Sequence, residues 1–168
     1  VFNLGIHRYT GGVYEPRGHK YVSRFDFSRI PQTTYQVGGA VLTTETILAD
    51  NEQQVMVRYT VEDAVLPVKL RFKPFLAFRN IHHLSKANMF VNHRFKKVTN
   101  GIEMQLYEKL PHLFMQFSKK TEFVPVPDWY YNIEYLKEKN RGYDCLEDLY
   151  VPGYFEVAVK RGESIIFS

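Results

Sequence analysis

Residues 55–61 read VMVRYTV, a sequence in which every second side chain is large and apolar. Successive side chains of a β-strand point to opposite faces, so this period of two predicts a strand with one buried face. The same alternation returns in three further stretches, at 68–73 (VKLRFK), 102–106 (IEMQL) and 155–160 (FEVAVK). The chain is therefore predicted to consist mainly of half-buried strands.

Turn-forming residues separate the predicted strands. Asn100-Gly101 is the strongest of these signals, because both residues accept the positive φ angles of a tight hairpin turn. The 13 Phe and 12 Tyr also favour strands, since aromatic side chains pack well on a pleated surface. About ten short strands with turns between them predict an all-β fold, an antiparallel β-sandwich, and 168 residues fit a single domain over 1–168.

Two segments depart from this alternation. From Pro125 to Gly153 the period of two disappears and charged pairs stand three residues apart, which predicts a short helix or irregular segment near 128–142. Asp128 is a suitable residue to cap that helix, and Gly142 is suited to end it. The second irregular stretch runs from Arg79 to Asn88 and is predicted to be a loop.

Charge and cysteine content narrow the class of protein. The chain has 22 Lys and Arg against 18 Asp and Glu, and its cations are scattered among acids, so a solvated surface is favoured over a nucleic-acid site. No apolar run reaches the roughly 18 residues of a membrane span. A single cysteine, Cys145, fits a reducing compartment, and we expect a cytoplasmic protein. Since the chain begins at Val1, we interpret it as an excised, N-terminally truncated part of a larger protein.

Four acidic residues within fifteen positions are the first candidates for chemistry: Glu134, Asp144, Glu147 and Asp148. A glycosidase needs one carboxylic acid and one carboxylate held several ångströms apart. Sequence proximity says nothing about that separation, so solvated or cation-paired carboxylates are the favoured interpretation and no catalytic residue is assigned. The adjacent His82 and His83 lack further ligands at metal-binding spacing, so we expect neither a metal nor another cofactor.

The aromatic run Trp129-Tyr130-Tyr131, with Tyr135, Tyr143 and Tyr150 downstream, lies in the segment without alternation. Flat rings beside Arg, Asp and Glu are typical of sugar-binding sites, where the rings pack on the apolar face of the pyranose. Aromatic and Arg anchors are equally typical of protein interfaces, and for an excised domain the interface is the favoured alternative.

Several motifs, in one order along nearly the whole chain, resemble the N-terminal domain of bacterial and archaeal glycogen debranching enzymes of the amylo-α-1,6-glucosidase type. The most specific motifs are near the C-terminal end. The motifs are His7-Arg8-Tyr9 with Gly11-Gly12, Gly18-x-Lys20-Tyr21, Tyr35-x-Val37-Gly38-Gly39, Arg71-Phe72-x-Pro74-Phe75-x-Ala77-Phe78-Arg79, Pro127-Asp128-Trp129-Tyr130, Glu134-Tyr135 with Glu138, Arg141-Gly142-x-Asp144, Glu147-Asp148-Leu149 and Pro152-Gly153.

The resemblance implies a galactose-mutarotase-like supersandwich, followed in the full protein by an (α/α)₆ barrel. In the family that barrel, a glycoside hydrolase, carries the carboxylates that hydrolyse α-1,6 branch linkages in glycogen catabolism, so this domain alone is expected to be inactive. The implied partners are the catalytic domain of the same polypeptide and an α-glucan, with no nucleic acid and no membrane. Two glycine- and tyrosine-rich motifs that family members carry earlier do not occur here, which predicts an exposed strand edge or pairing with another copy.

From these observations we hypothesise a non-catalytic accessory domain whose two irregular segments face the barrel and shape a glucan cleft. The aromatic residues would supply rings, and the charged residues would fix the segment or bind sugar hydroxyls. The alternatives are a scaffold domain that touches no ligand and a free-standing sugar hydrolase or epimerase. The candidate glucan-binding or docking residues are Arg79, His82, Trp129, Tyr130, Tyr131, Glu134, Arg141, Asp144, Glu147 and Asp148.

Overall fold

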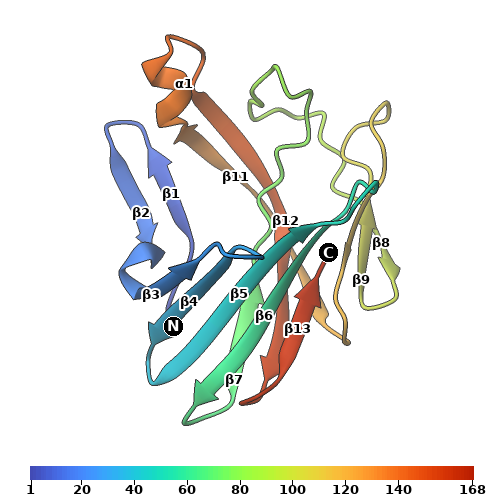
Figure 1. Ribbon diagram of the computed structural model, residues 1–168. Coiled ribbons are helices and arrows are strands. Elements are labelled where there is room, and N and C mark those ends of the chain that lie inside the picture. The colour runs from blue at the N-terminus through green and yellow to red at the C-terminus, as the bar shows by residue number, and fades with distance from the viewer.

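The computed structural model describes residues 1–168 and is built almost entirely from antiparallel strands (Figure 1). The first sheet has the order β2-β1-β11-β12-β7, the second β13-β6-β5-β4-β3 and the third β10-β9-β8. The bounds are β1 Ile6–Tyr9, β2 Val13–Arg17, β3 Val22–Asp26, β4 Gln32–Val37, β5 Ala40–Leu48, β6 Val55–Ala64, β7 Val68–Phe72, β8 Phe95–Val98, β9 Gly101–Met104, β10 Leu113–Gln116, β11 Glu122–Glu134, β12 Leu146–Val159 and β13 Ser164–Phe167. The predicted all-β sandwich class is confirmed.

The helices are a 3₁₀ turn, η1 (Gly18–Tyr21), and one short α-helix, α1 (Leu136–Asn140). Neither has the length and apolar composition that crossing a membrane requires. A tight hairpin joins β8 to β9 as predicted, but its turn residues are Thr99 and Asn100, with Asn100 at a φ of 55°. Gly101 begins β9 and lies opposite Val98.

Strand β6 shows why the alternating residues fold this way. Val61 is buried in the core, and Tyr59 packs against it from the same face of the sheet. Arg58 points to the opposite face, where its Nε donates to Glu45 on β5 at 2.6 Å. The apolar side chains are therefore removed from water while the charged ones stay solvated.

The core forms where the three sheets meet. Phe155 on β12 is fully buried, and its ring lies 5.0 Å from that of Phe117 and 4.8 Å from that of Phe123. Ile165 on β13 and Ile102 on β9 belong to the same cluster. Strand β12 is an interior strand of the first sheet, between β11 and β7, and its N-terminal end is paired with the end of β11.

The segment from Pro125 to Gly153 differs from the prediction. The proposed helix cap is wrong, because Asp128 lies inside β11 opposite Val151 and the helix begins only at Leu136. The alternation is lost for another reason: β11 carries two bulges, between Pro125 and Asp128 and between Tyr130 and Ile133, which shift the side chains relative to the sheet.

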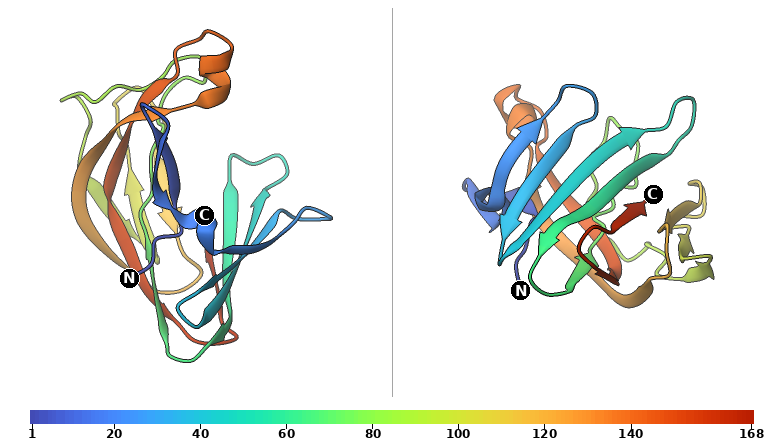
Figure 2. Two further views of the ribbon diagram at one scale, coloured as in Figure 1. Left: turned by 90° about the vertical axis from the view of Figure 1, so that its left-hand side faces the viewer. Right: turned by 60° about the horizontal axis from the view of Figure 1, so that its bottom comes forward.

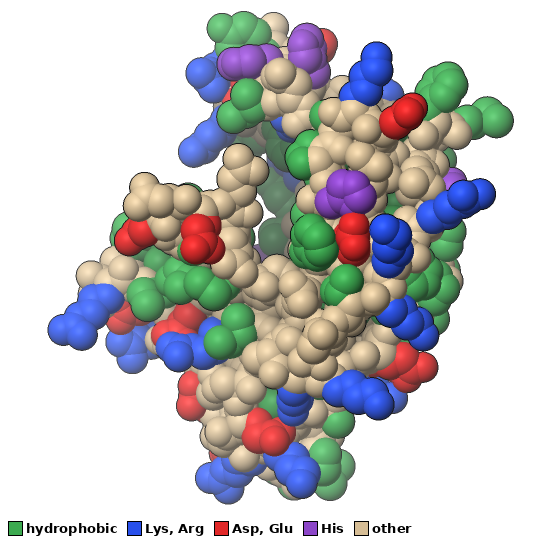
Figure 3. Space-filling view, turned by 90° about the vertical axis from the view of Figure 1, so that its right-hand side faces the viewer, with side chains coloured by type: hydrophobic (Ala, Val, Ile, Leu, Met, Phe, Trp, Pro, Cys, Tyr) green, Lys and Arg blue, Asp and Glu red, His purple; other side chains and the backbone are tan.

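The two large sheets diverge at one end of the molecule, as Figure 2 shows from the side. Seen from the opposite direction in Figure 3, the molecule has a deep hollow at this end, with hydrophobic side chains visible inside it. Leu48 and its β6 partner Val55 are exposed there, although they lie on the same face of the sheet as buried Val61. Only 23 of the 168 residues are buried, so much of the apolar surface between the sheets is uncovered.

Candidate functional site

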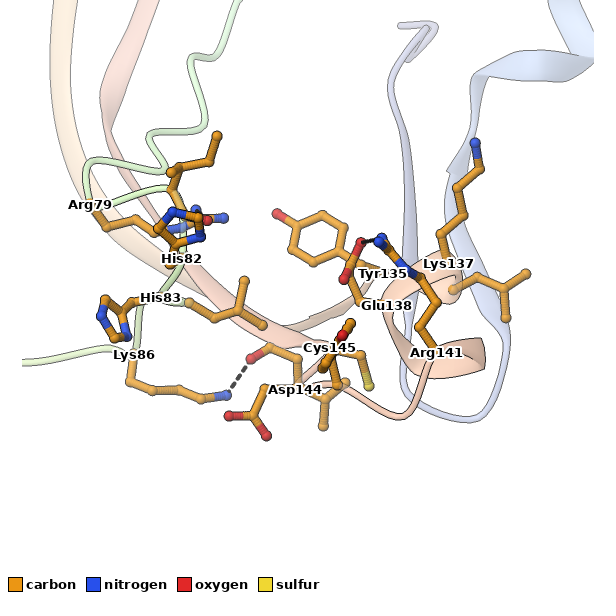
Figure 4. Close-up of a pocket in the computed structure, with 15 residues that line it drawn as sticks. Arg79, His82, His83, Lys86, Tyr135, Lys137, Glu138, Arg141, Asp144 and Cys145 are labelled. Atoms are coloured by element: carbon orange, nitrogen blue, oxygen red, sulfur yellow. Dashed lines mark hydrogen bonds and ion pairs between the residues drawn. The ribbon is translucent and has the colours of Figure 1, made fainter.

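An open cleft lies at the N-terminal end of β12, between α1 and the loop that follows β7 (Figure 4). It encloses about 1580 Å³, large enough for several sugar rings or a short protein segment. Arg79, His82 and Lys86 form one wall, and the α1 region forms the other. The remaining lining residues are Ile81, His83, Leu84, Tyr135, Leu136, Lys137, Glu138, Arg141, Tyr143, Asp144, Cys145 and Leu146.

Glu147 lies beneath this cleft and is completely buried. Arg79 binds it through two nitrogens, with Nε 2.6 Å from Oε1 and Nη2 3.2 Å from Oε2. The Tyr135 hydroxyl donates to Oε2 at 2.5 Å, and the Ser85 amide donates to Oε1 at 2.9 Å. One carboxylate therefore joins the loop, the segment before α1 and strand β12.

These contacts set the charge state of Glu147. Burial by itself would raise the pKa of a carboxyl, but hydrogen bonds from Arg79, Ser85 and Tyr135 outweigh it and lower the pKa of Glu147 from 4.5 to about 2. Burial and the bond to this carboxylate raise the pKa of Tyr135 to about 12. At neutral pH the site therefore holds a carboxylate, a guanidinium and a neutral phenol.

Asp148 anchors the same loop from the other face of β12. Its Oδ2 accepts from the Ala87 amide at 3.0 Å, and its Oδ1 accepts from the Asn132 amide at 2.8 Å. Asn132 has a φ of 57° and lies in the second bulge of β11. Asp148 therefore fixes the loop to that bulge, with one hydrogen bond to each of its two oxygens.

Glu134 secures α1 to the sheet. The side chain is almost completely buried, and its two oxygens accept from Arg8 Nε and Lys139 Nζ, each at 2.6 Å. Hydrogen bonds from Lys139 and Arg8 hold the pKa of Glu134 below its usual value. Because α1 has only five residues, this tie to β1 supplies an anchor that the helix itself is too short to provide.

The wall formed by α1 and the following turn is both charged and apolar. The Arg141 guanidinium lies 5.6 Å from the Tyr143 ring and donates to Glu138 at 3.1 Å. Tyr143 is exposed, as are Leu136 on this wall and Ile81 opposite. Exposed apolar side chains with polar residues around them are typical of a surface that receives a partner.

The residues from 1 to 166 match the protein family described as "Glycogen debranching enzyme N terminal". The chain belongs to this family. No match was found among curated proteins or among solved structures. The resemblance inferred from the motifs is therefore confirmed, and the cleft belongs to a domain of a glycogen debranching enzyme.

The debranching-enzyme domain brings together four of the ten candidate residues, since Arg79, His82, Arg141 and Asp144 line the cleft. Glu134, Glu147 and Asp148 lie beneath it as buried anchors. Nowhere in the structure do three His, Cys, Asp or Glu side chains come together as metal ligands.

The three candidate aromatic residues lie outside the cleft and point in different directions. Trp129 packs against the core, its ring 5.3 Å from that of Tyr150. Tyr130 faces the opposite side of the sheet, where its ring lies 4.5 Å from that of Phe75 and its hydroxyl contacts Lys73. Tyr131 is exposed. They therefore form no common platform for a sugar.

Leu136 and Lys86 line the cleft but were not among the predicted site residues, whereas Tyr143 belonged to the predicted aromatic group. The hydrogen bond from Tyr135 to Glu147 was not predicted. Tyr135 stands beside Glu134 in one of the family motifs, which was a usable signal. No sequence signal marked Lys86, because it binds a main-chain group. Its Nζ donates to the Leu146 carbonyl at 2.7 Å.

We expect acid to destabilise the domain through Glu147. Its pKa in the folded state lies below that of the unfolded chain, so protonation favours unfolding. The stabilisation is complete above pH 4.5 and is lost as the pH falls towards 2, a difference of about 3 kcal/mol for this group. Urea unfolding of the natural chain and of Glu147→Gln at several pH values measures this loss of unfolding free energy. Equal acid sensitivity of the two proteins would contradict this assignment.

Proposed function

We propose that this chain is a non-catalytic accessory domain that docks on the catalytic (α/α)₆ barrel of its debranching enzyme and contributes to α-glucan binding. The proposal is supported most directly by the way in which the two walls of the cleft are held. Buried carboxylates hold both of its walls, while the exposed side chains on those walls have few partners within the chain.

The state of the carboxylates supports a non-catalytic role. A glycosidase needs a general acid whose pKa is raised, so that it still carries a proton at the working pH. Glu147 and Glu134 have lowered pKa values, and every oxygen of these two residues accepts a hydrogen bond. Of the cleft's other acids, Glu138 pairs with Arg141 and Asp144 is exposed. Hydrolysis is therefore assigned to the catalytic domain of the parent enzyme.

Two features of the cleft suit a branched glucan. The Tyr143 ring offers a flat apolar surface, and the neighbouring Arg141 and Asp144 offer a donor and acceptors for hydroxyl groups. Leu136 and Ile81 on opposite walls give the barrel apolar anchor points. Trp129 is assigned a structural role, because its ring packs against the core.

Calorimetric titration of the chain with a branched maltooligosaccharide tests the glucan role. We expect Tyr143→Ala to weaken binding about tenfold, because one ring-to-sugar contact is lost. Phe114→Ala, which removes an exposed ring on β10, serves as the matched control and should bind as the natural chain does. Absence of binding by the chain, together with an unchanged KM of the Tyr143→Ala full-length enzyme, would eliminate the glucan role.

Docking is tested separately by hydrogen exchange. Amides of residues 81–86 and 136–145 should exchange more slowly in the full-length enzyme than in the isolated chain, since the barrel covers them there. Amides of the β8–β9 hairpin provide the internal control. Equal exchange of the cleft segments in both proteins would contradict docking at this face.

A further inference from the structure

Strand β3 presents an unpaired edge with an exposed apolar surface. It is the last strand of the second sheet and pairs only with β4. Figure 2 shows the β3–β4 hairpin projecting away from the rest of the molecule. Phe25 is 64% exposed and Phe27 72% exposed, and their rings stack with centroids 6.4 Å apart.

These rings lie on the side of the sheet that forms the core. Phe25 opposes Thr33 on β4, and that row continues across β5 and β6 to Ile165 on β13, which is fully buried. One end of the row is therefore covered by the first sheet and the other end is in water. The row consists of Phe25, Thr33, Thr44, Tyr59 and Ile165. A further strand beside β3 would cover the exposed ring at its open end.

Strand β3 has part of the protection that natural edge strands carry, since it has a bulge and the charged residues Arg24 and Asp26, but it has no lysine and no proline. Natural edge strands carry lysines or prolines that prevent pairing with another chain. Strand β8, an edge of the third sheet, has Lys96 and Lys97, whereas β3 reads VSRFD, with neither residue type. Its bulge lies between Val22 and Arg24, so the last three residues form a regular strand.

The charges of β3 identify the strand that fits against it. Arg24 and Asp26 flank Phe25 on one face and contact each other at 3.1 Å. In an antiparallel pair centred on Phe25, Arg24 of one strand lies opposite Asp26 of the other, and Asp26 opposite Arg24. Opposite charges that face each other across a pair of strands are stabilising, so this edge is complementary to itself.

We propose that two copies of this chain associate through antiparallel pairing of their β3 strands. The two second sheets then form one continuous sheet across a two-fold axis, as isologous contacts require. The four rings of Phe25 and Phe27 meet on the inner face, and two intermolecular ion pairs form on the outer face. The cleft lies on the first sheet, so this inference does not depend on the proposed function.

Charge reversal at β3 tests the proposal by sedimentation equilibrium. The natural chain is expected to shift with concentration from 19.8 kDa towards twice that mass. Arg24→Asp places two carboxylates opposite each other, and Asp26→Arg places two guanidinium groups opposite each other, so each variant alone is expected to weaken the dimer at least tenfold. An equimolar mixture of the two variants is expected to form a heterodimer, because every facing pair is then opposite in charge.

The double variant Arg24→Asp, Asp26→Arg exchanges the two charges and should restore the homodimer. Lys97→Asp, a charge reversal on the exposed edge of the third sheet, is the matched control and should leave the dimer unchanged. Circular dichroism verifies that each variant is folded. A natural chain that stays at 19.8 kDa at every concentration overturns the proposal. A dimer that persists in both single variants overturns it as well.

Discussion

Replacing Glu147 by Gln is expected to lower the free energy of unfolding by about 3 to 5 kcal/mol at pH 7. The substitution keeps the shape of the side chain but removes its charge, so the partly buried Arg79 is left without a counter-ion. The amide nitrogen also cannot accept the hydrogen bond that Ser85 or Tyr135 donates to the carboxylate. Removing one partner of a buried pair costs more than the net contribution of the pair, because the other charge stays desolvated.

Urea denaturation followed by circular dichroism measures this loss. Glu156→Gln is the matched control, because Glu156 is also on β12 and also binds an arginine, Arg71, but its arginine partner is exposed. A much smaller change is expected there, since solvent screens such a pair. Hydrogen exchange of residues 79–88 should accelerate in Glu147→Gln only. Similar stability changes in the two variants would contradict a central role for Glu147.

Replacing Phe155 by Ala is expected to cost about 3 to 5 kcal/mol as well, through a cavity instead of a lost charge. Its ring is fully buried and contacts rings from β11 and from the segment after β10, so no single neighbour is able to fill the space. The midpoint of thermal unfolding should fall steeply. Hydrogen exchange is expected to accelerate across β12 as a whole, in contrast to the local effect of Glu147→Gln.

Phe25→Ala is the control for this second substitution, because it removes the same side chain from an exposed strand position. Measured at a protein concentration where the chain is monomeric, its unfolding free energy should change by less than about 1 kcal/mol. A Phe155→Ala protein that loses no more than the control would show that the rings around position 155 do not form the principal core.

The sequence was sufficient to predict the regular strands and their class. In β6, Val57, Tyr59 and Val61 alternate with polar residues, and this alternation predicts which side chains face the core. Asn100 predicted the β8–β9 hairpin because the turn geometry needs a residue that accepts a positive φ. Both signals depend only on residues that are neighbours in the sequence. Such signals predict the structure correctly wherever a strand is regular.

The bulged strand and the buried carboxylates were not predictable in this way. Two bulges in β11 move the side chains out of phase, so a strand of thirteen residues lost its alternation and was interpreted as partly helical. Glu147 looked like a solvated acid, because its partner Arg79 stands 68 positions earlier and only the pairing of β12 with its neighbours brings them together. The family motifs marked both residues as important without revealing that they bind each other.

The pairing of β1 with β11 has a consequence for how the chain is made. Tyr9 lies opposite Ile133, so the hairpin of β1 and β2 acquires its neighbour only after more than one hundred further residues have been added. Translation proceeds at about 5 to 20 residues per second, so this hairpin is without its neighbouring strand for roughly 6 to 25 seconds. Closing such a long loop also slows the search for the native pairing. During synthesis these first strands therefore remain exposed to wrong pairing until β11 has been made.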